Sequence, residues 1–239
     1  MNERAPINHL NNAAAQAASP MTGRQLAGAA TWVFDLDNTL YDATTGLFSQ
    51  IDARMKAFIA RLLDLSEEAA FRVQKTYFRE YGATLRGLIK HHQVDPRTFL
   101  DFVHDIDLSP IAPDPALDAA LARTGGRKII FTNADRLHAE RVLARLGIAR
   151  HFDGIFDIEA AEYVPKPDAG IYRDMIARHG VSAASAVMVE DMARNLLPAH
   201  DLGMTTLWVE TTNVWGREGA AGAHVHHRTA ALSDWLNAL

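Results

Sequence analysis

The amino-acid sequence predicts an α/β fold, in which helices cover both faces of a Rossmann-like parallel sheet and an all-helical insert follows the first strand. Short apolar runs alternate with segments of helical periodicity from residue 110 onward, and this alternation is typical of parallel sheets with crossover helices. Residues 44–110 contain helical patterns but no convincing strand. Polar residues directly follow several apolar runs, at the strand ends where such sheets bind ligands.

The predicted strands are short and almost wholly apolar, as expected for strands that are buried on both faces. Helices between the later strands end at Gly147, Gly180 and Gly203, because glycine commonly follows a helix C-terminus. A last helix is predicted for residues 232–239. The predicted strands cover residues 32–34, 128–131, 152–158, 186–189 and 205–209.

The insert has its own helix signals. Apolar residues recur every three or four positions from Leu47 to Leu63, which predicts an amphipathic helix. Ser66 is expected to cap the next helix and Gly82 to end it, and Pro96 fits the first turn of a later one. The chain is therefore expected to consist of a disordered tail (1–28), an α/β core domain (29–43 and 112–239) and a helical cap domain (44–111).

The composition, with 48% hydrophobic and 22% charged residues among 239, is that of a soluble globular protein. A formal net charge of −5 gives no general attraction to nucleic acid or to an anionic membrane. Without cysteine, the chain has no disulfide framework, thiolate metal site or cysteine nucleophile, and a reducing cytoplasm fits. No apolar run reaches the ~18 residues of a membrane span. We expect a cytoplasmic protein that binds neither a nucleic acid polymer nor a membrane; its oligomeric state is not predicted.

Two carboxylates stand at the end of the first predicted strand. Asp35 and Asp37 are separated by one residue, so their side chains can converge where the strand gives way to a loop. Burying both is costly unless a cation or a proton lies between them. Taken alone, the pattern fits either a solvated turn, in which Asp and Asn bond to nearby backbone, or a metal site.

Three further polar clusters favour the metal site. Thr132-Asn133 and Glu190-Asp191 end two other predicted strands, and Lys166 lies in a loop between two prolines. Carboxylates without His or Cys favour Mg²⁺, which normally completes its shell with water and substrate phosphate. Thr132, the backbone of Asn133 and Lys166 can bind phosphate oxygens. The set predicts phosphoryl transfer through an aspartyl-phosphate, with one carboxylate as nucleophile and another as general acid/base.

These motifs resemble those of the haloacid dehalogenase superfamily of phosphatases. The match comprises Asp35-Leu-Asp37-Asn-Thr39, Thr132-Asn133, Lys166 and Glu190-Asp191, in the family's order, within residues 31–209. The resemblance implies that Asp35 is the nucleophile and a Mg²⁺ ligand, and that Asp37 is the general acid/base and gives its backbone carbonyl to the metal. It also implies phosphoryl binding by Thr132 and Lys166, and metal binding by Asp191 with help from Glu190.

A finer resemblance concerns the pyrimidine 5′-nucleotidase branch of this superfamily. It rests on Asp37-Asn-Thr-Leu-Tyr41, Tyr81-Gly-Ala-Thr84-Leu85-Arg86-Gly87, Phe102-Val-His104-Asp105 and Phe131-Thr-Asn-Ala134 followed by His138. The branch hydrolyses nucleoside monophosphates, especially UMP and CMP, and the superfamily's helical insert is a cap that selects the leaving group. The expected partner is therefore a small phosphomonoester, with substrate contacts from Asn133, Thr39, Tyr81 and Arg86.

Alternatives remain open at this level. The substrate can be another small metabolite, such as phosphoglycolate or a sugar phosphate. A C–halogen hydrolase uses the same nucleophile but needs neither Mg²⁺ nor Asp37, and a non-catalytic binding module would lack a member of the motif set. In the insert, aromatic residues such as Phe78 and Tyr81 fit either base stacking or core packing. Trp215 is interpreted as a packing residue.

Overall fold

Parallel strands form one sheet in the order β3-β2-β1-β4-β5-β6 in the computed structural model, which describes residues 19–239. The central strand β1 pairs with β2 and β4, so that Phe34 lies opposite Ile130 and Val189. The carboxyl ends of these three strands therefore meet at one edge of the sheet. The strands are β1 (Thr31–Phe34), β2 (Arg127–Phe131), β3 (Gly154–Phe156), β4 (Ala186–Glu190), β5 (Thr205–Val209) and β6 (His227–Thr229).

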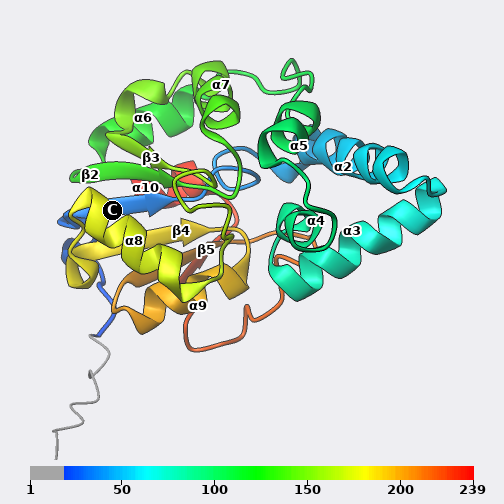
Figure 1. The fold of residues 1–239 in the computed structure, drawn as a ribbon. Coiled ribbons are helices and arrows are strands. Elements are labelled where there is room, and N and C mark those ends of the chain that lie inside the picture. The colour runs from blue at the N-terminus through cyan, green and yellow to red at the C-terminus, as the bar shows by residue number, and fades with distance from the viewer. Residues whose placement is uncertain (1–18) are drawn as a thin grey trace, which may run out of the picture.

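Helices cover both faces of the sheet, as predicted (Figure 1). Alternate residues of β1 point to opposite faces: Trp32 and Phe34 join one hydrophobic cluster and Val33 joins another. The first cluster includes side chains of α6 (Pro115–Arg123), α7 (Arg136–Leu146) and α10 (Leu232–Asn237). The second includes side chains of α8 (Ala169–His179) and α9 (Ala193–Asp201).

Four helices between β1 and α6 form a separate group beyond the carboxyl edge of the sheet (Figure 1). We call this group the helical insert. As predicted, Ser66 caps the second of these helices by accepting a hydrogen bond from the backbone N–H of Ala69, and Gly82 follows its last residue. Pro96 occupies the first turn of the fourth. The helices are α2 (Leu47–Leu63), α3 (Glu67–Tyr81), α4 (Thr84–His92) and α5 (Pro96–Val103).

The expectation of a disordered tail is wrong for the residues that precede β1 in the structure. Residues 1–18 lie outside the described residues. Beyond them, α1 (Arg24–Ala27) is a short helix whose Leu26 is buried, and the buried Met21 donates its backbone N–H to Thr205 Oγ1 at 2.9 Å. Both side chains belong to the same hydrophobic cluster as Trp32, so this segment is part of the packed fold.

Strand β6 was not among the predicted strands. This strand has only three residues, His227, Arg228 and Thr229, and none of them is apolar. It extends the edge of the sheet by pairing with β5, so that Trp208 lies opposite Arg228. An edge strand this short lacks the apolar run by which the other strands were predicted. Within residues 19–239, no helix is both long and apolar enough to cross a membrane.

Candidate active site

Asp35 lies where β1 ends, and the sheet holds its backbone. Its N–H donates to Val189 O at 2.9 Å, so the ladder between β1 and β4 continues one residue past the strand. Asn38 then adopts a left-handed conformation (φ 64°), which turns the loop back toward the strand. Thr39 consequently donates its hydroxyl to Asp35 Oδ2 at 2.8 Å and accepts the backbone N–H of Asp191 at 3.1 Å. Thr39, expected to bind substrate, is thus bonded to two of the carboxylate residues.

Lys166 is the central cation of the site. Its side chain is 1% exposed, and its ammonium donates to Asp35 Oδ1 at 2.7 Å, Glu190 Oε2 at 2.6 Å and Phe131 O at 2.8 Å. Burial disfavours the charged ammonium, but the attraction of Asp35 and Glu190 outweighs it and raises the pKa of Lys166. Lys166 therefore remains a cation at neutral pH.

Three buried carboxylates form a group beside Lys166, which bonds to two of them, Asp35 and Glu190. One oxygen from each of Asp35, Glu190 and Asp191 lies within 4.8 Å of the others. Burial, together with the charge of Glu190, raises the pKa of Asp35 to about 7, although Lys166 opposes the change. Burial and the same neighbour raise the pKa of Asp191 well above its usual value. Because one ammonium does not balance three carboxylates, the residues fit a bound cation, and a set made only of oxygen donors suits Mg²⁺.

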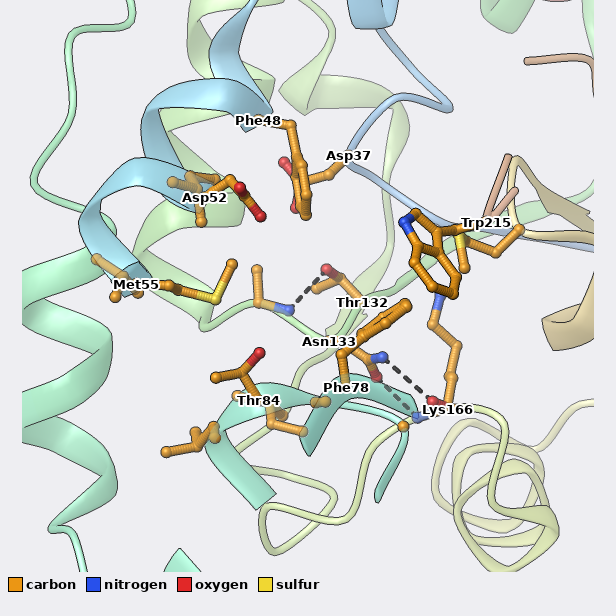
Figure 2. A pocket seen from close by; sticks show the side chains of 18 of the residues that line it. Asp37, Phe48, Asp52, Met55, Phe78, Thr84, Thr132, Asn133, Lys166 and Trp215 are labelled. Carbon is orange, nitrogen blue, oxygen red and sulfur yellow. Dashed lines mark hydrogen bonds between the residues drawn. The ribbon is translucent and has the colours of Figure 1, made fainter. Parts of the chain in front are cut away.

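Thr132 and Asn133 follow β2, beside the carboxylates. Thr132 is buried, and its hydroxyl accepts the backbone N–H of Ala134 at 3.0 Å (Figure 2). Asn133 holds the loop of Lys166: its Oδ1 accepts the Lys166 backbone N–H at 2.8 Å, and its Nδ2 donates to Lys166 O at 3.4 Å (Figure 2). Both residues line the cavity, but the amide of Asn133 is occupied in positioning the lysine.

The side chain of Asp37 is not among the three carboxylates that could hold a metal together, although it lines the same cavity. Its Oδ1 accepts hydrogen bonds from Tyr41 Oη at 2.6 Å and His138 Nε2 at 2.9 Å. Burial opposes ionisation, but the contacts with His138 lower the pKa of Asp37. Sequence reasoning did not predict these contacts; the available signal was the position of His138 in the first turn of a helix that starts just after a predicted strand.

A cavity of about 570 Å³ lies between the sheet edge and the helical insert. Asp35, Asp37 and Lys166 line it from the core, while the insert contributes Phe48, Met55 and Phe78 (Figure 2). Its volume is in the range of small-molecule sites. The cavity also has a wall from the loop after β5, where Trp215 meets Phe78 edge-on at 5.8 Å. The interpretation of Trp215 as a packing residue therefore missed its place beside the site.

The two residues of the insert that were expected to bind substrate lie in different places. Arg86, on α4, lines the cavity. Tyr81, at the end of α3, is not among the lining residues; its hydroxyl contacts His91 Nε2 at 2.8 Å, and Lys90 lies over its ring. The last turn of α3 directs the Tyr81 side chain toward α4.

The fold and the site together define an α/β protein with a lysine–carboxylate centre at the carboxyl edge of its sheet, below a cavity of small-molecule size. The sequence model of the haloacid dehalogenase-like hydrolases matches residues 30–203. Because this match covers well over half of the chain, the protein belongs to the haloacid dehalogenase-like hydrolase family.

Two curated relatives share much of the chain. Phosphate metabolism protein 8 of Saccharomyces cerevisiae is 32% identical over 193 residues, which make up 72% of this chain and 58% of the yeast protein. The chain thus spans little more than half the length of that relative. Glyceraldehyde 3-phosphate phosphatase of Methanothermobacter thermautotrophicus is 23% identical over 194 residues, or 74% of this chain and 84% of the archaeal protein.

Solved structures share the fold at low sequence identity. A HAD phosphatase from Thermococcus onnurineus superposes with a TM-score of 0.58 and 19% identity, covering 87% of this chain and 96% of that one. The L-2-haloacid dehalogenase from Xanthobacter autotrophicus with chloropropionic acid covalently bound gives a TM-score of 0.53 and 17% identity, covering 87% of this chain and 97% of that one. Because phosphatases and dehalogenases both have this architecture, the likeness identifies the fold and not the reaction.

Proposed function

We propose that this protein is a Mg²⁺-dependent phosphomonoester hydrolase that works through an aspartyl-phosphate on Asp35, and that its substrates are pyrimidine nucleoside 5′-monophosphates such as UMP and CMP. The observation that carries the proposal is the buried Asp35 carboxylate, held 2.7 Å from the Lys166 ammonium and grouped with Glu190 and Asp191 at the base of the cavity. A carboxylate in this setting is a nucleophile with cationic charge beside it.

The residues divide the chemistry between them. Asp35 attacks phosphorus, while Lys166 favours the ionised form of its carboxylate and offsets the negative charge of the phosphoryl group. Thr132 binds a phosphoryl oxygen from the strand end of β2. Asp35, Asp191 and Glu190, with the backbone carbonyl of Asp37, would hold Mg²⁺, which supplies charge neutralisation at the transferring phosphoryl group.

Asp37 favours phosphate ester cleavage over C–halogen cleavage. Asp37 follows the nucleophile by two residues in the sequence and lines the same cavity. There its carboxyl group can protonate the departing oxygen and later accept a proton from the attacking water. A departing halide needs no such proton. The complete carboxylate set also speaks against a non-catalytic binding module.

The walls of the cavity favour an organic leaving group with a flat ring. Residues 44–111 act in this proposal as the cap domain, and they contribute Phe48 and Phe78, while the core contributes Trp215. Aromatic faces of this kind stack on bases, and Arg86 adds hydrogen-bond donors for a base or a ribose. The second candidate function is that of a phosphatase for a small sugar phosphate, and the name of the archaeal relative, glyceraldehyde 3-phosphate phosphatase, supports it.

Phosphate release from UMP, CMP, AMP, GMP, phosphoglycolate and glyceraldehyde 3-phosphate, measured with Mg²⁺ and with EDTA, tests the proposal. We expect Mg²⁺-dependent release that is greatest for UMP and CMP. Release favouring the sugar phosphate would select the second candidate, and release unaffected by EDTA would exclude the metal.

The covalent step has its own prediction. The Asp35→Asn variant should lose at least about a thousandfold in turnover, because an amide of the same size cannot attack phosphorus. The matched control is Asp42→Asn, since Asp42 is an exposed carboxylate that caps the short turn after the motif. Appreciable turnover by Asp35→Asn, with circular dichroism unchanged, would exclude the aspartyl-phosphate.

A further inference from the structure

The two oxygens of the Asp37 carboxylate are in different environments. Oδ1 accepts two hydrogen bonds, from Tyr41 at 2.6 Å and from His138 at 2.9 Å. Oδ2 receives no hydrogen bond from residues 19–239, and Asp37 lines the cavity that holds Asp35. A carboxylate with both donors on one oxygen presents the other oxygen for proton exchange.

His138 is held rigidly on the core side of this carboxylate. Its side chain is fully buried, and its ring lies against the ring of His104, with centroids 4.4 Å apart and planes inclined by 21°. Asp135 fixes both residues, because its Oδ1 accepts the His138 backbone N–H at 2.7 Å and its Oδ2 contacts His104 Nδ1 at 2.9 Å. The ring therefore has little freedom to turn away from Asp37.

The polar contacts of the His138 ring point in one direction. Its Nδ1 has no hydrogen-bond partner in the described part of the chain, so Nε2 makes the ring's hydrogen bond. A carboxylate only accepts hydrogen bonds, so Nε2 carries the proton and donates it. Tyr41, 6% exposed, supplies the second donor from the loop that contains Asp37 itself.

We propose that His138 and Tyr41 are positioning residues that clamp Asp37 Oδ1 and so direct Oδ2 at the oxygen that enters or leaves the phosphoryl group. This inference rests on the proposed function. Before the first half-reaction, Asp37 Oδ2 takes up a proton from solvent. The bond from Asp35 to phosphorus then forms as the ester P–O bond breaks, and that proton goes to the leaving alcohol. In the second, water attacks phosphorus, its proton returns to Oδ2, and the bond from Asp35 to phosphorus breaks.

The clamp predicts an effect that depends on the leaving group. An alkoxide needs a proton as it departs, whereas p-nitrophenolate departs without one. Because kcat/KM reports on the steps up to enzyme phosphorylation, Tyr41→Phe and His138→Leu should each lower kcat/KM for a nucleoside monophosphate by about tenfold or more. The fall with p-nitrophenyl phosphate should stay within about threefold.

Two further variants separate positioning from folding. His138→Gln offers an amide N–H in place of Nε2–H and should recover part of the lost kcat/KM for the nucleoside monophosphate. His200→Gln is the control, since within residues 19–239 the His200 side chain makes a hydrogen bond only to the exposed Asp201 next to it. The proposed clamp would be overturned if Tyr41→Phe and His138→Leu lowered kcat/KM equally for both substrates, or if His138→Gln recovered none of the lost kcat/KM.

The test remains decisive if the proposed function fails. Activity that is absent from the wild type, or retained by Asp35→Asn, contradicts the phosphatase mechanism and not the hydrogen bond. NMR of the imidazole N–H protons then tests the clamp directly. We expect a slowly exchanging Nε2–H resonance that is lost in His138→Gln and shifted in Asp37→Asn; a His138 ring N–H that is insensitive to Asp37→Asn would overturn the proposal.

Discussion

Asp135 joins the helical insert to the core through one carboxylate. It caps α7 (through the His138 backbone N–H) and also binds the side chain of His104, the residue that follows α5. Burial alone would raise its pKa, but the hydrogen bond and charge of His104 lower the pKa of Asp135 to about 2. The ionised carboxylate is therefore favoured more in the folded protein than in the unfolded chain.

This shift predicts how stability depends on pH. Because the folded pKa lies below the ordinary value of 3.8, the contribution of Asp135 is complete above about pH 4 and is lost as the pH falls toward 2. Asp135→Asn keeps a residue that can cap a helix but loses the charge. Urea unfolding between pH 2 and 6 should show a lower free energy of unfolding at pH 6 and a shallower fall below pH 4 than in the wild type.

The matched control for this prediction is Asp174→Asn, which removes an exposed carboxylate on α8. Its curve should run parallel to that of the wild type. If the Asp135→Asn curve is also parallel, the pairing with His104 contributes nothing to the acid sensitivity of the fold.

At the scale of single elements, α3 and α4 pack so closely that only glycine fits at position 87. A Cβ built there would lie 2.3 Å from Tyr77 Cγ, well inside van der Waals contact. Gly87→Ala should lower the free energy of unfolding by about 1–3 kcal/mol, although alanine is the better helix former. Gly125→Ala is the control, because its nearest new contact is at 3.7 Å. Thermal denaturation checks the prediction, and an equal melting temperature for both variants would contradict it.

Helix α4 also separates two residues that the sequence placed together in the substrate site. Arg86 lines the cavity, whereas the Tyr81 hydroxyl is bonded to His91 outside it. Arg86→Ala should raise KM for UMP by about tenfold, the cost of one hydrogen bond from a charged group, with a smaller effect on p-nitrophenyl phosphate. Tyr81→Phe should leave both constants unchanged. Steady-state kinetics on the two substrates checks this prediction. A larger rise in KM for Tyr81→Phe than for Arg86→Ala would indicate that the substrate binds on the Tyr81 side of α4.

The parts of the fold that follow from local pattern were predictable, and the parts that follow from packing were not. The ends of the apolar runs and the glycines that end helices predicted that Lys166 and the acidic residues lie at one edge of the sheet, because the carboxyl ends of parallel strands lie at the same edge. The contact of His138 with Asp37 spans 101 residues and depends on how α7 rotates against β1. Leu26 is a single large apolar residue between Gln25 and a run of Ala and Gly, and Trp215 reaches the cavity from a loop, so neither position has a periodicity that predicts it.

At the scale of the whole molecule, two structural parts share one cavity. The sheet edge supplies Lys166 and the group of three carboxylates, and the helical insert supplies most of the apolar lining residues. The His104–Asp135 contact ties the end of the insert to the core. A substrate that fills the cavity contacts both parts, so binding of its organic group and alignment of its phosphoryl group depend on the same relative placement.

The excess of buried negative charge predicts that a divalent cation stabilises the entire fold. The burial that raises the pKa values of Asp35 and Asp191 shows that the charged forms are disfavoured when no cation is present. A ligand at a hundred times its Kd adds about 2.7 kcal/mol to the free energy of unfolding. For a chain of this size we expect Mg²⁺ to raise the melting temperature by roughly 5–10 °C relative to EDTA.

Replacement of Asp191 by asparagine should change how the melting temperatures of variant and wild type compare in the two buffers. In EDTA the variant should melt at the same temperature as the wild type or above it, because it removes one buried charge from a repulsive group; in Mg²⁺ it should gain little and melt below the wild type. Glu210→Gln, which changes an exposed carboxylate just after β5, should keep the full response. Differential scanning calorimetry with and without Mg²⁺ distinguishes these outcomes. A variant that loses stability equally in both buffers would mean that Asp191 supports the fold through its contacts alone, and that the carboxylate group does not bind the metal.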